Sequence, residues 1–225
     1  MIETKNAIYL HVPKTGGSWR NQILKPIEVE YKEHGWLKSR PDKPVFAFVR
    51  NPWDWHRSMY KFETNGSESH LAQTGMSAIL KGLPKNYDFD DYVTALCAPT
   101  SAFKTLALSI AKINVKINNL PTDYYEPVFF EKWLTSTKGH YQFIYDIAVE
   151  FATEVGRYEN MKEDFINMLK SAGDLTDKIH DTIETTAPMN ISKSTADRSL
   201  VYSQTTADLI YKSCKEIIDN HGYTF

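Results

Sequence analysis

The stretch "IYLHVPKTGGSWRNQIL", residues 8–24, carries the strongest structural signal in this chain. Its apolar part, residues 8–12, predicts a short buried strand. Gly16 and Gly17 then allow a tight turn, and residues 18–24 are typical of a helix. A helix that starts at a glycine turn presents unpaired N–H groups and partial positive charge, so this stretch predicts a site for phosphate or sulfate.

The order of residues in this loop argues against a nucleoside triphosphate held with magnesium. Lys14 precedes the glycines, whereas the nucleotide-triphosphatase pattern G-x-x-x-x-G-K-[ST] ends on a Gly-Lys pair and a hydroxyl residue. A lysine at the loop entrance suits a transfer in which Lys14 neutralises a bridging or leaving oxygen. Thr15 and Ser18 add hydroxyl donors. The alternative is a strand-to-helix turn that carries a lysine and binds nothing.

A second loop of the same kind follows in "VFAFVRNPWDWHRSMY", residues 45–60. Residues 45–49 predict a strand buried on both faces, followed by a turn and a helix. Arg50 offers a planar fork of donors for a phosphate. Ser58 comes eight residues later, about two helical turns on, and offers a hydroxyl to the same group. An ion pair between Arg50 and Asp54 is the alternative.

The alternation of strands and helices predicts an α/β three-layer sandwich with a mainly parallel central sheet, in a single domain over residues 1–225. Both loops then lie at the carboxyl ends of strands, where open α/β sheets bind ligands. The other predicted segments are a surface loop at 64–75, a helix from about Asp90, a break at 118–127, a strand pair or strand and turn at 142–150, a strand and amphipathic helix within 153–173 that stops at Gly173, an irregular stretch at 181–206, and a last helix at 207–220 that ends at Gly222.

Composition excludes several classes of function. The formal net charge of -2 leaves no global positive field for nucleic acid or an acidic membrane. Only two cysteines occur, which favours free thiols in a reducing compartment over a disulfide framework. The sequence has no long apolar run and no metal-ligand spacing. We therefore expect a cytoplasmic protein that needs no metal, with no nucleic-acid or membrane partner.

Two loops that each suit a phosphate indicate a ligand phosphorylated at two separate places, and here the sequence resembles sulfotransferases that use 3′-phosphoadenosine 5′-phosphosulfate. "HVPKTGGS" resembles the 5′-phosphosulfate loop of that family, and "VFAFVRNPWDWHRSMY" resembles its 3′-phosphate motif, including the spacing from arginine to serine. "GRYENMKEDF", residues 156–165, resembles the stretch beside the adenine pocket, and residues 208–225 resemble the C-terminal end of small bacterial-type members. Residues 64–140 match no stretch of the family.

The resemblance implies a P-loop NTPase-like sulfotransferase fold and a role for each matched residue. Lys14 is the implied catalytic lysine, which stabilises the leaving phosphate oxygen. Arg50 and Ser58 are implied to bind the 3′-phosphate, and Tyr158 to pack near the adenine. The residues implied to wrap the 5′-phosphate are Thr15, Gly16, Gly17, Ser18 and Trp19. From the stretch before the last helix, Lys193 or Arg198 is implied to reach the 3′-phosphate.

The implied reaction moves a sulfuryl group to a hydroxyl or amine of a small molecule or carbohydrate and releases 3′-phosphoadenosine 5′-phosphate. It needs a base, and His34, just upstream of the second strand, is the best candidate. Glu63 and His70 are the other candidates. Two functions of other kinds stay open: a P-loop kinase that uses magnesium and ATP, and a non-catalytic module that binds a phosphorylated ligand.

Overall fold

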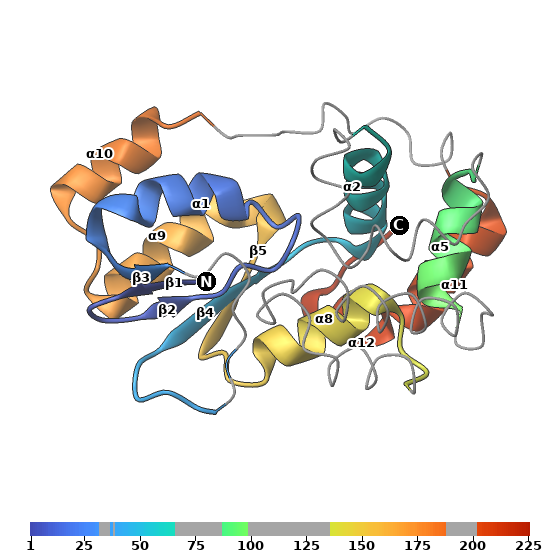
Figure 1. Ribbon diagram of the computed structural model, residues 1–225, viewed down its shortest axis with the longest axis horizontal. Coiled ribbons are helices and arrows are strands. Elements are labelled where there is room, and N and C mark those ends of the chain that lie inside the picture. Colours follow the sequence, from blue (N-terminus) through green and yellow to red (C-terminus); the bar gives the residue numbers. More distant parts are fainter. Residues whose placement is uncertain (32–36, 38, 66–86, 99–135, 188–201) are drawn as a thin grey trace, which may run out of the picture. The chain divides into compact units, whose positions relative to one another are not determined.

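The computed structural model describes residues 1–31, 37, 39–65, 87–98, 136–187 and 202–225 (Figure 1). The chain divides into two compact units. The first, which we call the sheet unit, comprises Met1–Asn51 and Ile144–Lys193. The second, the helical unit, comprises Pro52–Phe143 and Ser194–Phe225. That the chain forms one domain stays a prediction.

The sheet unit is built on a five-stranded open sheet in the order β3-β1-β2-β4-β5. Strand β2 pairs with β4 and β4 pairs with β5 in parallel, whereas β1 pairs with both β2 and β3 in antiparallel. The prediction of a mainly parallel sheet is therefore wrong, because β1 and β3 add an antiparallel half that sequence analysis did not foresee. The strands are β1 (Ile2–Thr4), β2 (Ile8–Tyr9), β3 (Glu28–Tyr31), β4 (Val45–Val49) and β5 (Glu154–Arg157).

The parallel half of the sheet brings three strand ends to one edge. Ile8 lies opposite Val45 where β2 pairs with β4, and Val49 lies opposite Arg157 where β4 pairs with β5. The segments that follow these three strands therefore leave the sheet at the same edge. They are the loop that enters helix α1 (Gly17–Leu24), the residues after Val49, and the short 3-10 helix η2 (Tyr158–Asn160).

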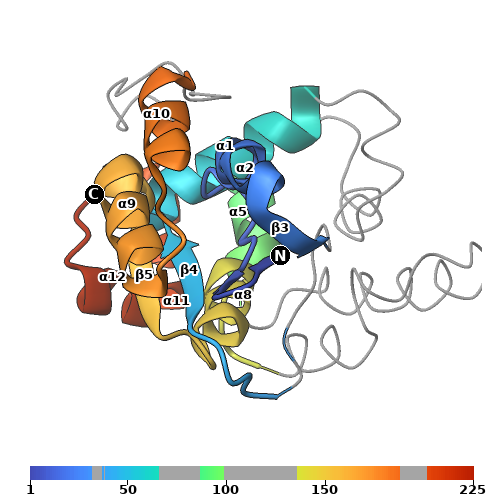
Figure 2. The same ribbon diagram turned by 90° about the vertical axis from the view of Figure 1, so that its left-hand side faces the viewer.

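Helices cover one face of this sheet. Helix α1 is followed by the 3-10 helix η1 (Lys25–Ile27), and it packs with α9 (Met161–Ala172) and α10 (Asp177–Thr185) around a core that includes Phe46, Phe48 and Phe165 (Figures 1 and 2). Phe46 and Phe48 share this face because side chains alternate along a strand, and Val45 and Ala47 belong to the core on the other face. The predicted α/β class is confirmed.

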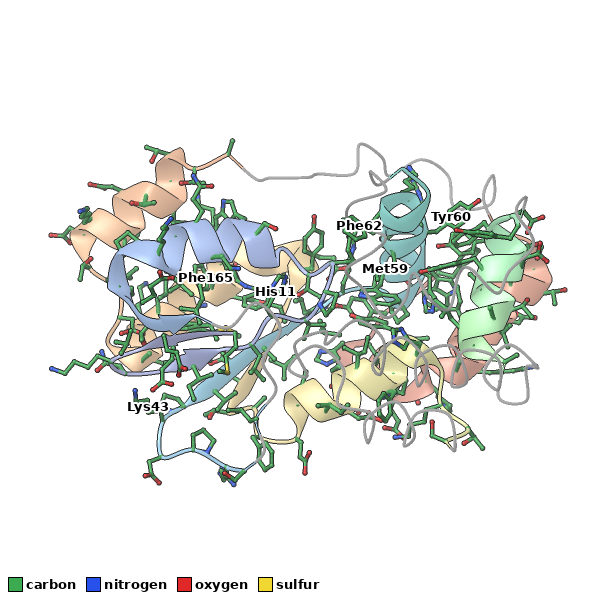
Figure 3. All side chains as sticks on the ribbon, in the orientation of Figure 1. His11, Lys43, Met59, Tyr60, Phe62 and Phe165 are labelled. Atoms are coloured by element: carbon green, nitrogen blue, oxygen red, sulfur yellow. The ribbon has the colours of Figure 1, made fainter. Side chains whose placement is uncertain are left out.

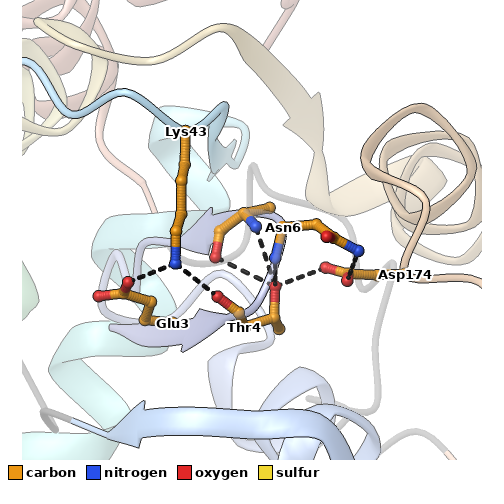
Figure 4. A network of polar contacts seen from close by, with 6 residues as sticks. Glu3, Thr4, Asn6, Lys43 and Asp174 are labelled. Atoms are coloured by element: carbon orange, nitrogen blue, oxygen red, sulfur yellow. Dashed lines mark hydrogen bonds and ion pairs between the residues drawn. The ribbon is translucent and has the colours of Figure 1, made fainter.

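A polar network holds the β1–β2 hairpin against the end of helix α9 (Figure 4). The buried Asp174 carboxylate accepts hydrogen bonds from the Thr4 hydroxyl at 2.6 Å, the Asn6 amide at 2.9 Å and the Tyr9 hydroxyl at 2.9 Å. Burial, together with the charge of Asp174, raises the pKa of Tyr9, so its hydroxyl stays protonated and donates. Three donors around one carboxylate fix the hairpin that leads into the glycine loop.

The helical unit contains α2 (Pro52–Asn65), α5 (Phe89–Cys97), α11 (Gln204–Ser213), α12 (Lys215–His221) and the first turn of α8 (His140–Val149), whose remainder belongs to the sheet unit. Trp55 stacks on Tyr141 with ring centroids 4.2 Å apart. Helix α5 packs against α11, and the Thr206 hydroxyl donates to Asp90 at 2.7 Å between them. This unit therefore has its own aromatic and polar core.

Several sequence predictions are confirmed and others are wrong. The strand and helix within 153–173 form as β5 and α9, and Gly173 ends α9 with φ +75°. The strand predicted at 142–150 is wrong, because this segment lies in helix α8. The irregular stretch 181–206 includes the end of α10 and the start of α11, and the last helix is two helices that meet at Cys214.

The two cysteines, Cys97 and Cys214, are buried free thiols, as the sequence predicted. In the ranges that the structure describes, we find no helix with the length and apolar character needed to cross a membrane. The predicted break at 118–127 lies outside these ranges, as does most of the predicted loop at 64–75.

Candidate functional site

The glycine loop between β2 and α1 adopts a backbone that few sequences tolerate. Lys14 has φ +63° and Gly16 has φ +78°, both in the left-handed region. This conformation costs a residue with a side chain roughly 1–2 kcal/mol, so a lysine held there indicates a functional constraint. Helix α1 begins at Gly17, has no acidic residue in its first turn, and has a glycine, Gly16, at its N-cap position, which has no side chain to cap the helix. Its first N–H groups are thus available to an anion.

Close packing explains why both glycines are needed in the loop. A Cβ atom on Gly17 would lie 2.1 Å from the His11 ring, which Figure 3 shows near the start of α1. A Cβ atom on Gly16 would lie 2.2 Å from the Met161 sulfur and 3.4 Å from Tyr158 Cε2. The loop therefore lies close to His11, two residues after β2, and to Met161 at the start of α9. Neither position has room for a side chain.

Two of the predicted 5′-phosphate residues use their side chains in hydrogen bonds within the protein. Thr15 is fully buried, and its hydroxyl donates to the Val12 carbonyl at 2.8 Å. Trp19 is buried in the core, where its indole N–H donates to the Thr186 carbonyl at 3.1 Å. Ser18 by contrast is exposed at the start of helix α1. A hydroxyl contribution to an anion is therefore expected from Ser18.

The structure brings Arg50 to the glycine loop. Arg50 directly follows β4, and its Nη1 lies 3.3 Å from the backbone oxygen of Lys14, to which it donates a hydrogen bond. The two loops that sequence analysis singled out therefore meet at the carboxyl ends of β2 and β4. Parallel pairing of these two neighbouring strands is the reason. The Arg50 guanidinium and the Lys14 backbone are thus brought together at one edge of the sheet.

Tyr158 contacts both loops. The Arg50 guanidinium carbon lies 4.3 Å from the centroid of the Tyr158 ring, and the same ring lies close to Gly16. An aromatic face holds a guanidinium in a defined plane through a cation–π contact. Glu159 adds a further tie, because its carboxylate accepts the Asn51 N–H at 2.8 Å. The segment after β5 thus orients Arg50 against the loop.

Helix α1 places a third cationic residue, Arg20, on the core side of the loop. Arg20 is 2% exposed, its Nη1 donates to the Thr15 carbonyl at 2.9 Å, and its guanidinium carbon lies 4.1 Å from the Phe48 ring centroid. Burial lowers the pKa of Arg20 to about 9, which leaves it charged at neutral pH. Sequence analysis missed Arg20. The available signal was a charged residue on the same helix stripe as Ile23 and Leu24, which are both buried.

Four predicted site residues are outside the described part of the sheet unit. Ser58 is half-buried on helix α2 in the helical unit, and its cooperation with Arg50 stays a prediction. His34, Lys193 and Arg198 lie outside the described residues. Sequence analysis also missed Met161, which packs on the loop.

A buried histidine and cysteine lie together in the helical unit. His56 Nδ1 is 2.7 Å from the Pro52 carbonyl oxygen, and its Nε2 is 3.3 Å from the Cys97 sulfur. Nδ1 therefore donates to the carbonyl, and Nε2 is left to accept from the thiol. Burial lowers the pKa of His56 to about 4, so the ring is neutral at physiological pH. Both side chains are at most 1% exposed, which closes this pair to solvent.

Comparison of the chain with protein-family models, with curated proteins and with solved structures found no match. Within the described ranges, no group of three or more histidine, cysteine, aspartate or glutamate side chains is arranged to hold a metal ion. The described groups that suit an anion lie in the sheet unit: a glycine loop at a helix N-terminus, Arg50 beside it, and Arg20 on the core side of it.

Proposed function

We propose that this protein is a sulfotransferase with a P-loop-like fold, which moves a sulfuryl group from 3′-phosphoadenosine 5′-phosphosulfate to a hydroxyl or amine of a small molecule or carbohydrate. The observation that carries the proposal is the contact between Arg50 Nη1 and the Lys14 backbone oxygen at 3.3 Å. This contact supports the proposal that the two loops lie close enough to bind one ligand together. A nucleotide with phosphate at both the 3′ and 5′ positions has the charge distribution that two such loops would recognise.

The residues present fit the donor's phosphates. A helix N-terminus without acidic residues suits the 5′-phosphate, and Arg50, which lies over the Tyr158 ring, has the fork of donors that suits a phosphate. A Gly-Lys pair followed by a hydroxyl residue, which a magnesium-dependent kinase of this type uses, is missing from the loop sequence. The order of residues therefore favours the sulfuryl donor over ATP.

Sulfuryl transfer resembles phosphoryl transfer, in which positioning and charge stabilisation supply most of the catalysis. An acceptor oxygen or nitrogen forms a bond to sulfur while the bond from sulfur to the 5′-phosphate oxygen breaks. Lys14 and the loop N–H groups would neutralise the charge that gathers on that leaving oxygen. The acceptor's proton passes to a base, for which His34 is the candidate, and 3′-phosphoadenosine 5′-phosphate leaves.

The direct test is transfer of radiolabelled sulfate from the donor to a panel of phenols, alcohols, amines and sugars. We expect labelled product with at least one class of acceptor. Lys14→Ala is expected to lower the rate by about 10²–10³, the usual cost of losing one preorganised charge contact. Lys25→Ala removes an exposed lysine just after the other end of helix α1 and is the matched control, for which we expect wild-type rates.

Binding of 3′-phosphoadenosine 5′-phosphate, measured by calorimetry, separates affinity from chemistry. We expect Arg50→Ala to weaken binding strongly, and Arg40→Ala, at an exposed position, to leave it unchanged. A protein that neither binds this nucleotide nor transfers label contradicts the proposal. Hydrolysis of ATP with magnesium would favour the kinase alternative instead.

A further inference from the structure

The sheet unit contains a buried guanidinium whose surroundings do not neutralise it. Arg20 is 2% exposed, and its Nη2 is buried with no hydrogen-bond partner among the described residues. Its other contacts are the Thr15 carbonyl, through Nη1 at 2.9 Å, and the Phe48 ring at 4.1 Å. Within the described part of the chain no carboxylate forms an ion pair with it. Charged groups are almost never fully buried without a partner, so this guanidinium is placed where a nearby negative charge would stabilise the fold.

The contact with Thr15 also sets the direction of the loop's N–H groups. The Thr15 carbonyl points to Arg20, toward the core. In a trans peptide the carbonyl and the following N–H point in opposite directions, so the Gly16 N–H points away from Arg20. The loop carries left-handed residues on both sides of Thr15, at Lys14 and Gly16, so this peptide has a defined orientation. Arg20 therefore helps to turn the Gly16 N–H toward the side where an anion would bind.

We propose that Arg20 is a positioning residue for the anion bound by the glycine loop: it orients the Thr15–Gly16 peptide so that the Gly16 N–H faces the anion, and the anion's negative charge on the far side of that peptide offsets the positive charge of the buried guanidinium. Anion binding itself requires only the loop, whereas the identity of that anion as the 5′-phosphate of the sulfuryl donor rests on the proposed function. A purely structural arginine would stabilise the empty protein. A positioning arginine of this kind lowers the stability of the anion-free protein, because its charge is buried, and raises the stability of the protein with the anion bound.

Two substitutions separate charge from hydrogen bonding at this position. Arg20→Gln removes the charge and keeps an N–H donor, while Arg20→Lys keeps the charge and loses the planar fork. Lys25→Gln removes an exposed positive charge just after the other end of helix α1 and is the matched control. The probes are inorganic phosphate and 3′-phosphoadenosine 5′-phosphate. The readouts are the dissociation constant by calorimetry and the melting temperature with and without the probe.

For Arg20→Gln we expect phosphate affinity to fall by about tenfold or more, as for the loss of one charge-assisted contact. Arg20→Lys is expected to lose less phosphate affinity than Arg20→Gln, and Lys25→Gln is expected to keep the wild-type affinity. The melting temperature of empty Arg20→Gln is expected to equal or exceed that of the wild type, while the increase on adding phosphate shrinks. The opposite result, a lower melting temperature with unchanged phosphate affinity, would assign Arg20 to the core and overturn the proposal.

A measurement on the wild type covers the case in which Arg20→Gln does not fold. The Arg20 side-chain N–H resonance, assigned by its loss in Arg20→Lys, is expected to shift as phosphate is added. A resonance that stays in place through saturation overturns the proposal. Wild-type protein that binds phosphate in an Arg20-dependent way but transfers no sulfuryl group would refute the proposed function and support this inference. Normal sulfuryl transfer with unchanged phosphate affinity in Arg20→Gln would refute this inference alone.

Discussion

Replacement of Gly16 by alanine tests the packing of the anion-binding loop. Gly16 has φ +78°, so an alanine there pays for a left-handed backbone at roughly 1–2 kcal/mol. Its Cβ would also lie 2.2 Å from the Met161 sulfur, which must move. Forcing a methyl group into a packed site costs about 1–3 kcal/mol. We therefore expect Gly16→Ala to lower the free energy of unfolding by about 2–5 kcal/mol.

Gly173→Ala is the matched control because it isolates the backbone cost. Gly173 lies in the same unit with φ +75°, and among the described residues its Cβ would meet only the Asn6 side-chain nitrogen, at 3.8 Å. We expect it to lose about 1–2 kcal/mol, the left-handed cost alone. Urea denaturation followed by circular dichroism gives both values under one set of conditions.

The contact with Met161 can be isolated further by a double-mutant cycle. Met161→Ala removes the sulfur that the new methyl group meets, so Gly16→Ala should cost less in that background than in the wild type. The remaining loss should match that of Gly173→Ala. The reasoning is refuted if Gly16→Ala and Gly173→Ala destabilise the protein equally. The close approach of Met161 to the loop would then add nothing to the loss of unfolding free energy.

Two further predictions follow from other contacts. Tyr158→Ala should weaken binding of 3′-phosphoadenosine 5′-phosphate by about two- to thirtyfold, since a cation–π contact contributes about 0.5–2 kcal/mol. Tyr158→Phe keeps the aromatic face over Arg50 and should bind the nucleotide as the wild type does. Equal affinities of Tyr158→Ala and the wild type in a calorimetric titration would contradict this role. His56 is neutral in the fold with a pKa of about 4, below its ordinary value near 6.5, so the unfolded chain binds more protons between these values and stability should fall as the pH drops from about 6.5 to 4. His56→Asn should remove on the order of 3 kcal/mol of that pH dependence in urea titrations, and an unchanged profile would show that His56 is not responsible.

The sequence predicted the parts of the structure that depend on neighbouring residues. The five apolar residues 45–49 form β4, and Gly173 ends α9, because strand burial and a left-handed helix stop are local properties. The run 142–150 was misread as strand because its aromatic and β-branched residues favour strands. In helix α8 the buried residues Tyr141, Ile144, Tyr145 and Ala148 follow helical spacing, which is how this helix packs.

The sequence by itself determined that two loops rich in anion-binding groups each follow a short apolar strand. Only the tertiary structure decided that the Arg50 guanidinium reaches the Lys14 backbone, that Tyr158 lies against that guanidinium, and that Arg20 is buried below the loop. The antiparallel half of the sheet was likewise decided at that level. The physical reason is range: backbone preferences act within a few residues, whereas strand direction and the burial of a charge depend on segments far apart in the chain.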